Sequence, residues 1–176
     1  MKLIILDRDG VINQDSDDFI KSPEEWLPIP GSLEAIALLN KLGFTVSVAT
    51  NQSGVARQLF TLDTLSKIHQ KMHDTLQAVG GKIDSIFYCP HGPDDNCDCR
   101  KPKPGLLLQI AKHYQISLKG IMVVGDSFRD LVAAQSVDAK PLLVKTGKGE
   151  RTLAKHAEEL KEIVVFPDLL SLAKAL

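Results

Sequence analysis

The sequence predicts an α/β fold in which a doubly wound, mostly parallel sheet carries helices on both faces. Short apolar runs alternate along the chain with segments of helical period. The runs lack polar alternation, as expected of strands buried on both faces. The length of 176 residues suits one domain, so we expect residues 1–176 to form a single unit without a separate cap domain. Strand and helix alternation at this spacing favours parallel pairing.

Five apolar runs predict the strands of this sheet. Each is short, rich in Val, Ile, Leu or aromatic residues, and followed by polar or turn-forming residues. In chain order they are KLIIL (2–6), FTVSVA (44–49), IDSIFYC (83–89), GIMVVG (120–125) and PLLVK (141–145).

The segments between these runs predict helices, because their apolar residues recur at three- and four-residue spacing. The first two end at Gly43 and Gly80, which are typical helix terminators. A further helix is expected near the end of the chain. The predicted helices span residues 32–43, 61–80, 104–115, 127–137 and 167–175.

Composition limits the partners of the protein. The net charge is −1 with 24% charged residues, so the basic excess typical of nucleic-acid binding is missing. The N-terminal MKLIILDRDG has only four consecutive apolar residues, too few for a signal peptide or a membrane span. We therefore expect a cytoplasmic protein with a small-molecule partner, no nucleic acid and no membrane. The lack of an extra apolar segment favours a monomer.

Polar residues follow the predicted strands. In an open parallel sheet, ligands bind beyond the carboxyl ends of the strands, so these residues are expected to share one edge. Asp7 and Asp9 are two apart and can point the same way. The residues at this edge are Asp7, Asp9, Thr50, Asn51, Lys101 and Asp126.

These residue types suit phosphoryl transfer. Oxygens of Asp7, Asp9 and Asp126 can converge on Mg²⁺, a hard cation with oxygen ligands. The cation would offset the repulsion between a carboxylate and a phosphate, so that an aspartyl-phosphate can form. Thr50 and Lys101 would stabilise the phosphoryl oxygens. Asp9 would act as general acid and then as general base.

All three cysteines lie in the stretch CPHGPDDNCDCRK at 89–101. The spacing C-x-H-x₅-C-x-C predicts a closed, structural Zn²⁺ site made of four protein ligands. Such a loop would wall the crevice and hold Arg100 beside Lys101. The alternative is a surface loop of reduced cysteines without metal. The predicted ligands are Cys89, His91, Cys97 and Cys99.

Four other features allow alternative interpretations. HQKMH at 69–73 has metalloprotease histidine spacing but lacks the glutamate, and its histidines are expected to flank the buried helix stripe or be exposed. TGKGERT lacks P-loop spacing and predicts an ordinary loop. Trp26 either anchors local packing or lines a sugar site. Asp130 either supports the site or interacts with a helix dipole.

Four motifs in order resemble those of the haloacid dehalogenase superfamily of phosphatases. They are LDRDGV, ATNQSG, RKPKPG and VVGDSFRD, and they reach from residue 6 to residue 130. Within the superfamily, NQSGVAR and the cysteine-rich loop are similar to the phosphatases that remove the 7-phosphate of D-glycero-D-manno-heptose 1,7-bisphosphate. Those enzymes serve nucleotide-activated heptose and lipopolysaccharide synthesis. Histidinol-phosphate phosphatases carry a similar loop and stay open as an alternative.

The resemblance implies a role for each matched residue. Asp7 is the nucleophile and Asp9 the acid/base, with its main-chain carbonyl on Mg²⁺. Lys101, rather than Lys103, matches the catalytic lysine. Residues 15–18 (DSDD) occupy the substrate-loop position but are unusually acidic. The positions that match substrate contacts are Asn51, Gln52, Ser53 and Arg100.

Two non-enzymatic interpretations compete with a phosphatase. A phosphoacceptor signalling domain also combines an aspartate, a hydroxyl residue and a lysine, but it places the acceptor on a middle strand and needs no acid/base. Here the first strand carries Asp7 and the second carboxylate, Asp9, lies two residues on. A zinc-centred interaction module would leave the aspartates and Lys101 unexplained.

Overall fold

The protein is built on a single parallel sheet. In a computed structural model that describes residues 1–176, six strands follow the order β3-β2-β1-β4-β5-β6, and every neighbouring pair is parallel. β1 and β4 lie side by side at the centre, where the strand order reverses. The strands are β1 (Leu3–Leu6), β2 (Thr45–Asn51), β3 (Ser85–Cys89), β4 (Met122–Gly125), β5 (Lys140–Val144) and β6 (Val164–Phe166).

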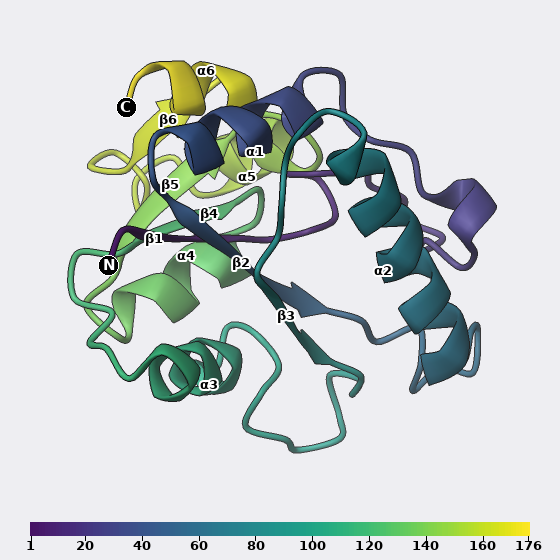
Figure 1. Ribbon diagram of the computed structural model, residues 1–176. Coiled ribbons are helices and arrows are strands. Elements are labelled where there is room, and N and C mark those ends of the chain that lie inside the picture. Colours follow the sequence, from purple (N-terminus) through teal and green to yellow (C-terminus); the bar gives the residue numbers. More distant parts are fainter.

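Helices cover both faces of the sheet. α1 and α6 lie on one side and α3 and α4 on the opposite side (Figure 1). α2 packs beside α1, and its residues share the same apolar cluster. The helices are α1 (Ser32–Lys41), α2 (Leu62–Gln77), α3 (Gly105–Tyr114), α4 (Phe128–Gln135), α5 (Gly149–Lys155) and α6 (Leu169–Lys174), with a short 3-10 turn η1 (Pro23–Glu25).

Two main apolar clusters hold these layers together. One cluster of 22 buried residues joins the sheet to α1, α2 and α6, and another of 12 joins it to α3 and α4. Alternate residues of the central strand divide between them: Ile4 and Leu6 belong to the first, Leu3 and Ile5 to the second. A strand buried on both faces is apolar throughout, which explains the unbroken LIIL run.

The predicted fold class is confirmed, and the five predicted strands and five predicted helices are present. The sequence prediction missed β6, α5 and η1. β6 is a three-residue edge strand with Val164 exposed, so it carries little apolar signal. α5 begins with Gly-Glu-Arg in a segment that was predicted to be a loop. Its seven residues are too few to show a helical period.

Trp26 is a packing anchor and does not line a ligand site. It is fully buried in the larger cluster. Lys71 of α2 donates hydrogen bonds to the carbonyls of Pro23 and Trp26 and lies over the indole ring. These contacts fix the chain segment between the cleft and α1.

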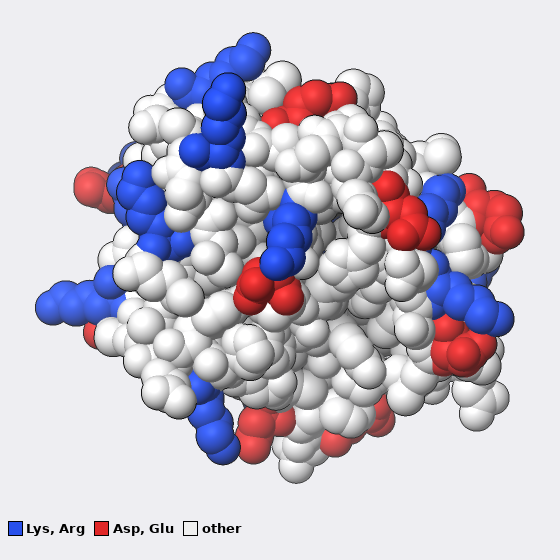
Figure 2. Space-filling model, in the orientation of Figure 1, with Lys and Arg blue, Asp and Glu red and all other residues white.

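Charged groups of both signs are interspersed over the face seen in Figure 2, where positive and negative side chains often lie together. This pattern matches the near-zero net charge. No helix combines the length and the apolar character that a membrane span requires.

Candidate active site

A polar cleft opens beyond the carboxyl ends of the strands. It is lined by 17 residues, of which Phe19 is the one hydrophobic side chain. Most of the predicted site residues meet there. The cleft includes Asp7, Asp9, Asn51, Gln52, Ser53, Arg100, Lys101 and Asp126.

Buried carboxylates form the floor of the cleft. One oxygen each of Asp7, Asp126 and Asp130 lies within 4.8 Å of the others. Burial, and then the charge of Asp130, raise the pKa of Asp7 to about 7. Burial and the charge of Asp7 also raise the pKa of Asp126. Crowded carboxyl groups resist ionisation because their negative charges repel one another. A divalent cation bound between them would remove this repulsion, and carboxylate oxygens are ligands that such cations prefer.

Two glycines enclose the Asp126 carboxylate. Gly10 has φ +85° and Gly147 φ +57°, and a Cβ at either position would collide with Asp126 Oδ2. The main-chain N–H of Lys148 donates to the same oxygen at 2.8 Å. Asp126 Oδ2 is therefore held by the protein, while Oδ1 is left for a cation.

Both carboxylate oxygens of Asp130 are engaged by the protein. Its Oδ1 contacts Lys101 Nζ at 2.6 Å. Its Oδ2 accepts from the main-chain N–H groups of Asp126 and Ser127 and from the Ser127 hydroxyl. Burial raises the pKa of Asp130, but Lys101 and Ser127 outweigh it and lower the pKa overall. Asp130 thus both caps α4 and supports Lys101, the two roles that the sequence left open.

Lys101 connects the carboxylates to the sheet. Its Nζ lies 3.1 Å from Asp7 Oδ1 and 2.8 Å from the carbonyl of Ala49. Burial lowers the pKa of Lys101, but Asp130 and Asp7 outweigh it and raise the pKa overall, so the side chain stays charged. Asn51 fixes the lysine backbone, because its side-chain amide bonds both the N–H and the carbonyl of Lys101.

Asp9 is held by a set of donors. Arg8 Nε and Nη2 and Asn13 Nδ2 all donate to Asp9 Oδ1. Gln52 Nε2 donates to Oδ2 at 3.2 Å. Burial raises the pKa of Asp9, but Arg8, Asn13 and Gln52 outweigh it and lower the pKa overall. The Asp9 main-chain carbonyl accepts no hydrogen bond from the protein, so it is free to bind a cation.

Thr50 is the one predicted catalytic residue that does not line the cleft. It is buried at the end of β2. Its hydroxyl accepts from Gln52 Nε2 at 3.0 Å and donates to the Asn51 carbonyl at 3.4 Å. A phosphate contact would require this hydroxyl to turn away from Asn51.

Two of the three aspartates in the acidic segment 15–18 pair with basic residues. Asp15 pairs with Lys148 Nζ and Asp17 with Arg151, each at 3.5 Å. Lys148 also lines the cleft and, through its main chain, holds Asp126. The loop TGKGERT thus contributes to the site, which its sequence did not predict.

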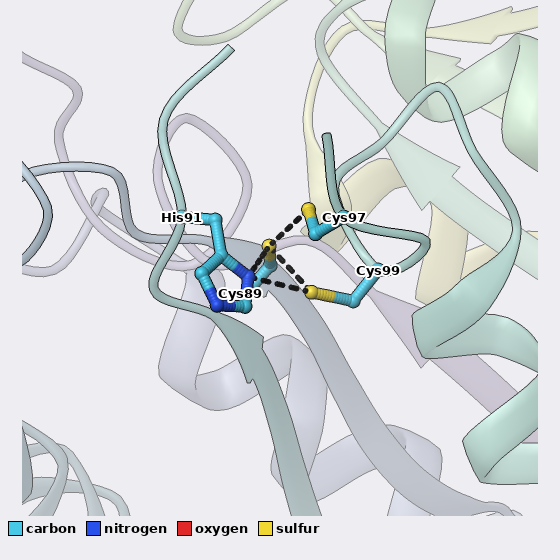
Figure 3. A group of neighbouring side chains, drawn as sticks. All are labelled: Cys89, His91, Cys97 and Cys99. Atoms are coloured by element: carbon cyan, nitrogen blue, oxygen red, sulfur yellow. Dashed lines mark hydrogen bonds between the residues drawn. The ribbon is translucent and has the colours of Figure 1, made fainter. Parts of the chain in front are cut away.

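The four predicted zinc ligands meet in one cluster. Cys89 ends β3, and the other three side chains point toward it from the following loop (Figure 3). Their ligand atoms lie within 4.8 Å of one another, and the cysteines form no disulfide. Cys89 Sγ is 3.7 Å from Cys97 Sγ and 3.6 Å from His91 Nδ1. Tetrahedral zinc with Zn–S bonds of about 2.3 Å spaces its ligands by similar distances, but Cys99 Sγ lies only 2.7 Å from Cys89 Sγ and would have to move outward to admit the ion.

The loop that carries these four side chains leads directly into the segment that contains Arg100 and Lys101. The Lys103 ammonium donates to the Cys97 carbonyl, and the Gly105 N–H donates to the Asp98 carbonyl. The N–H of Ala56 reaches the Pro90 carbonyl, which joins the loop to the segment after β2. The two main-chain bonds, from Gly105 and from Ala56, therefore fix the backbone on both sides of Arg100 and Lys101.

Sequence reasoning missed several residues of the site. His69 is wrongly predicted as flanking or exposed: it is 8% exposed, and its Nε2 lies 3.1 Å from Arg8 Nη1. Burial and the charge of Arg8 lower the pKa of His69 to about 3. Arg57 and Arg129 also line the cleft. Arg57 belongs to the motif NQSGVAR, which could have indicated a place in the cleft. Arg129 lies on a helix, and no motif in the sequence indicates that it reaches the cleft.

We expect Mg²⁺ binding to compete with protons, because Asp7 must ionise and its pKa is about 7 in the metal-free protein. The apparent affinity should weaken about tenfold per pH unit below that value for each displaced proton. Calorimetric Mg²⁺ titrations between pH 5.5 and 8.5, in buffers of different ionisation enthalpy, measure affinity and proton release. An affinity that is constant over this range would contradict the crowding of Asp7 and Asp126.

Comparison with known proteins identifies the family. A protein-family profile described as HAD-hydrolase-like matches residues 98–172. The D-glycero-beta-D-manno-heptose-1,7-bisphosphate 7-phosphatase of Pseudomonas putida is 58% identical over 176 residues, covering 100% of this chain and 99% of that protein. The chain belongs to this heptose bisphosphate phosphatase family. The phosphatase of the same name from Neisseria meningitidis serogroup A is 52% identical over 99% of this chain and 94% of its own.

A solved structure of the heptose bisphosphate phosphatase family has the same fold. The D,D-heptose 1,7-bisphosphate phosphatase of Bordetella bronchiseptica, complexed with magnesium and phosphate, matches with a TM-score of 0.95 and 55% identity. The match covers 99% of this chain and 97% of that one. The chain is thus a phosphatase of the haloacid dehalogenase superfamily, and the signalling-domain and zinc-module interpretations are set aside.

Proposed function

We propose that the protein removes the 7-phosphate of D-glycero-β-D-manno-heptose 1,7-bisphosphate, in the synthesis of nucleotide-activated heptose. The observation that carries this proposal is the juxtaposition of Asp7, Lys101 and Asp126 on the cleft floor, with Asp9 at its side. The names of the relatives specify the β anomer of the substrate.

Asp7, Asp126 and the main-chain carbonyl of Asp9 would hold Mg²⁺, and their all-oxygen donor set suits that ion. The magnesium in the Bordetella bronchiseptica structure supports this assignment. When bound, the ion supplies positive charge that offsets the repulsion between the Asp7 carboxylate and the phosphate.

In the first step, a carboxylate oxygen of Asp7 attacks phosphorus and the bond from phosphorus to the sugar oxygen breaks. Asp9 must carry a proton for this step, although its hydrogen-bond donors lower its pKa in the empty site, and it gives that proton to the departing oxygen. Lys101, charged and 3.1 Å from Asp7 Oδ1, stabilises the phosphoryl oxygens as negative charge develops. Thr50 would add a hydroxyl donor once it turns from the Asn51 carbonyl.

In the second step, Asp9 takes a proton from water as the water oxygen bonds to phosphorus. The bond from phosphorus to Asp7 breaks, and inorganic phosphate and the free carboxylate result. One carboxyl group that changes from acid to base completes both halves of the reaction. Asn51, through its two bonds to the Lys101 main chain, keeps the lysine in place throughout.

Three arginines in the cleft suit the second phosphate of a bisphosphate. Arg57, Arg100 and Arg129 line the cleft together. Burial, and then the charges of Arg129 and Arg57, lower the pKa of Arg100. Cations that repel one another gain when an anion enters between them. Gln52 and Ser53 lie on the same side as Arg57 and complete the substrate surface that we propose.

Phosphate release in the presence of Mg²⁺ tests the proposed function. The substrates are the β and α anomers of heptose 1,7-bisphosphate, histidinol phosphate and a small phosphate ester. We expect the highest kcat/KM for the β-bisphosphate, with heptose 1-phosphate as the product. A preference for histidinol phosphate would replace this proposal with the alternative kept from the sequence.

Arg100→Ala should lower kcat/KM more for the bisphosphate than for a simple phosphate ester. The expected loss of kcat/KM corresponds to about 2–3 kcal/mol, the value of one charge-assisted contact. Lys112→Ala is the control for loss of a cation, since Lys112 is exposed on α3 and does not line the cleft. Equal losses on both substrates would assign Arg100 to the chemistry and not to recognition.

We propose that Cys89, His91, Cys97 and Cys99 bind a structural Zn²⁺. The mixed thiolate and imidazole donors and their spacing fit zinc. With four protein ligands, no position is left for water. The ion would stiffen the loop that carries Arg100 and Lys101. Thiolate ligands also fit a reducing compartment, and we propose the cytoplasm.

Elemental analysis of protein purified without chelator should find about one zinc per chain. Mild EDTA should remove Mg²⁺ and stop turnover reversibly, while zinc stays bound, because soft ligands hold it far more tightly. Cys97→Ser should lower zinc content and weaken turnover of the bisphosphate. Zinc-free, fully active protein would refute the assignment.

We propose that residues 1–176 work as one catalytic domain in a monomer. One sheet uses six strands drawn from Leu3 to Phe166, so the chain folds as one unit. Light scattering across a concentration series checks this proposal.

A further inference from the structure

Arg8 lies between the two aspartates of the site and is completely buried. A buried guanidinium is costly unless it is paired. Arg8 meets this requirement on two sides: Nε and Nη2 reach Asp9 Oδ1 at 2.9 and 2.7 Å, and Nη1 lies 3.1 Å from His69 Nε2. The arginine therefore bridges an aspartate at the end of β1 and a histidine on α2.

The two oxygens of Asp9 have unequal surroundings. Oδ1 accepts from Arg8 Nε, Arg8 Nη2 and Asn13 Nδ2, which saturate its lone pairs. Oδ2 accepts from Gln52 Nε2 alone, at 3.2 Å. A proton cannot be added to Oδ1 without losing a donor. The oxygen that exchanges protons is therefore Oδ2.

His69 fixes the orientation of the guanidinium. Arginine has donors and no acceptor, so His69 must accept at Nε2 and carry its proton on Nδ1. The ring is buried, and its helix is anchored by the buried Leu65, Ile68 and Met72. Nε and Nη2 of the planar guanidinium then both donate to Asp9 Oδ1 from a fixed direction.

We propose that Arg8 and His69 are positioning residues that hold Asp9 Oδ1 and thereby aim Oδ2 at the sugar oxygen and, later, at the attacking water. This inference rests on the proposed acid/base role of Asp9. It assigns a catalytic consequence to His69, a residue of a covering helix that does not line the cleft. A plain structural ion pair would stabilise the fold without favouring either oxygen.

Leaving-group dependence separates the two possibilities. An alkoxide leaving group needs the proton from Asp9, whereas 2,4-dinitrophenolate leaves without one. Because kcat/KM reports steps up to the first irreversible one, it isolates formation of the aspartyl-phosphate. We expect His69→Leu to lower kcat/KM for the heptose bisphosphate about 10- to 100-fold, as misplaced catalytic groups do. For 2,4-dinitrophenyl phosphate it should change less than about twofold.

Matched variants complete the test. His73→Leu makes the same substitution one turn along α2, and His73 makes no hydrogen bond with Arg8. It should leave both substrates unaffected. His69→Gln restores an acceptor and should recover most of the lost rate. If His69→Leu does not fold, Arg8→Lys, which keeps the charge but loses the fork, should show the same selective loss.

Asp9→Asn separates failure of this inference from failure of the proposed function. The proposed function stands if the wild-type protein releases phosphate and Asp9→Asn lowers kcat/KM much more for the heptose bisphosphate than for 2,4-dinitrophenyl phosphate. The positioning role is overturned if His69→Leu or Arg8→Lys then lowers kcat/KM equally for both substrates. It is also overturned if kcat/KM changes for neither substrate.

Discussion

Asp7→Asn should reduce turnover of every phosphate ester by about 10⁴-fold or more, because the amide cannot attack phosphorus. The loss should come without unfolding. The amide is nearly isosteric with the carboxylate, and it can still accept from the Arg8 N–H at Oδ1. The substitution also removes one of the crowded buried acids. Phosphate release and thermal unfolding are the measurements, and the unfolding midpoint should move by less than about 4 °C.

The site of phosphorylation provides a second readout. Wild-type protein quenched during turnover should carry acid-stable, hydroxylamine-sensitive phosphate on Asp7, and Asp9→Asn should accumulate it when 2,4-dinitrophenyl phosphate is the substrate. Mass spectrometry of the peptide containing both aspartates locates the group. Phosphate on Asp9, or fast turnover by Asp7→Asn, would contradict the assigned roles.

Lys101→Ala should slow all substrates alike, by about 10³-fold, because it removes the charge next to the group that all of them share. It should also destabilise the protein by about 3–5 kcal/mol, because Asp7 and Asp130 lose their buried partner. The pKa of Asp7 is already raised to about 7 in the folded protein, and loss of the lysine, which lowers it, should raise it further above its unfolded value. The variant should therefore be more stable at pH 5 than at pH 8.

Lys103→Ala is the matched control for this prediction. Both lysines stand in the stretch RKPKP, but Lys103 is exposed and contacts only the Cys97 carbonyl. Its removal should leave kcat/KM within about twofold and stability within about 0.5 kcal/mol. A larger catalytic effect at Lys103 than at Lys101 would reverse the assignment of the catalytic lysine.

The sequence predicted most of the fold because buried parallel strands are apolar throughout. Leu3–Leu6 and the other central strands show this signal strongly. Edge strand β6 does not show this signal, because it has only three residues and Val164 is half-exposed, which is too little for a recognisable apolar run. The positions of Asp7, Asp9 and Asp126 followed from the rule that chemistry collects at the carboxyl ends of strands.

The support of the site could not be predicted in the same way. His69 lies 61 residues from Arg8 in sequence, and its contact depends on how α2 packs on the sheet. Asn51 and Lys101 are joined by hydrogen bonds between a side chain and a main chain, which leave no pattern in the residue types. Lys148 acts on Asp126 through its N–H, a group that almost every residue has.

The strand order has a consequence for synthesis of the protein on the ribosome. β1 is the first strand to be made, yet its neighbour β4 and the loop that encloses Asp126 come late in the chain. Asp7 is therefore synthesised long before Asp126, and the loop containing Gly147, which encloses Asp126, is synthesised later still. A nascent chain that stalls before residue 126 lacks Asp126, one of the proposed cation ligands, and the loop that encloses it. We therefore expect the cleft to become competent only after β4 and the loop after β5 have joined β1.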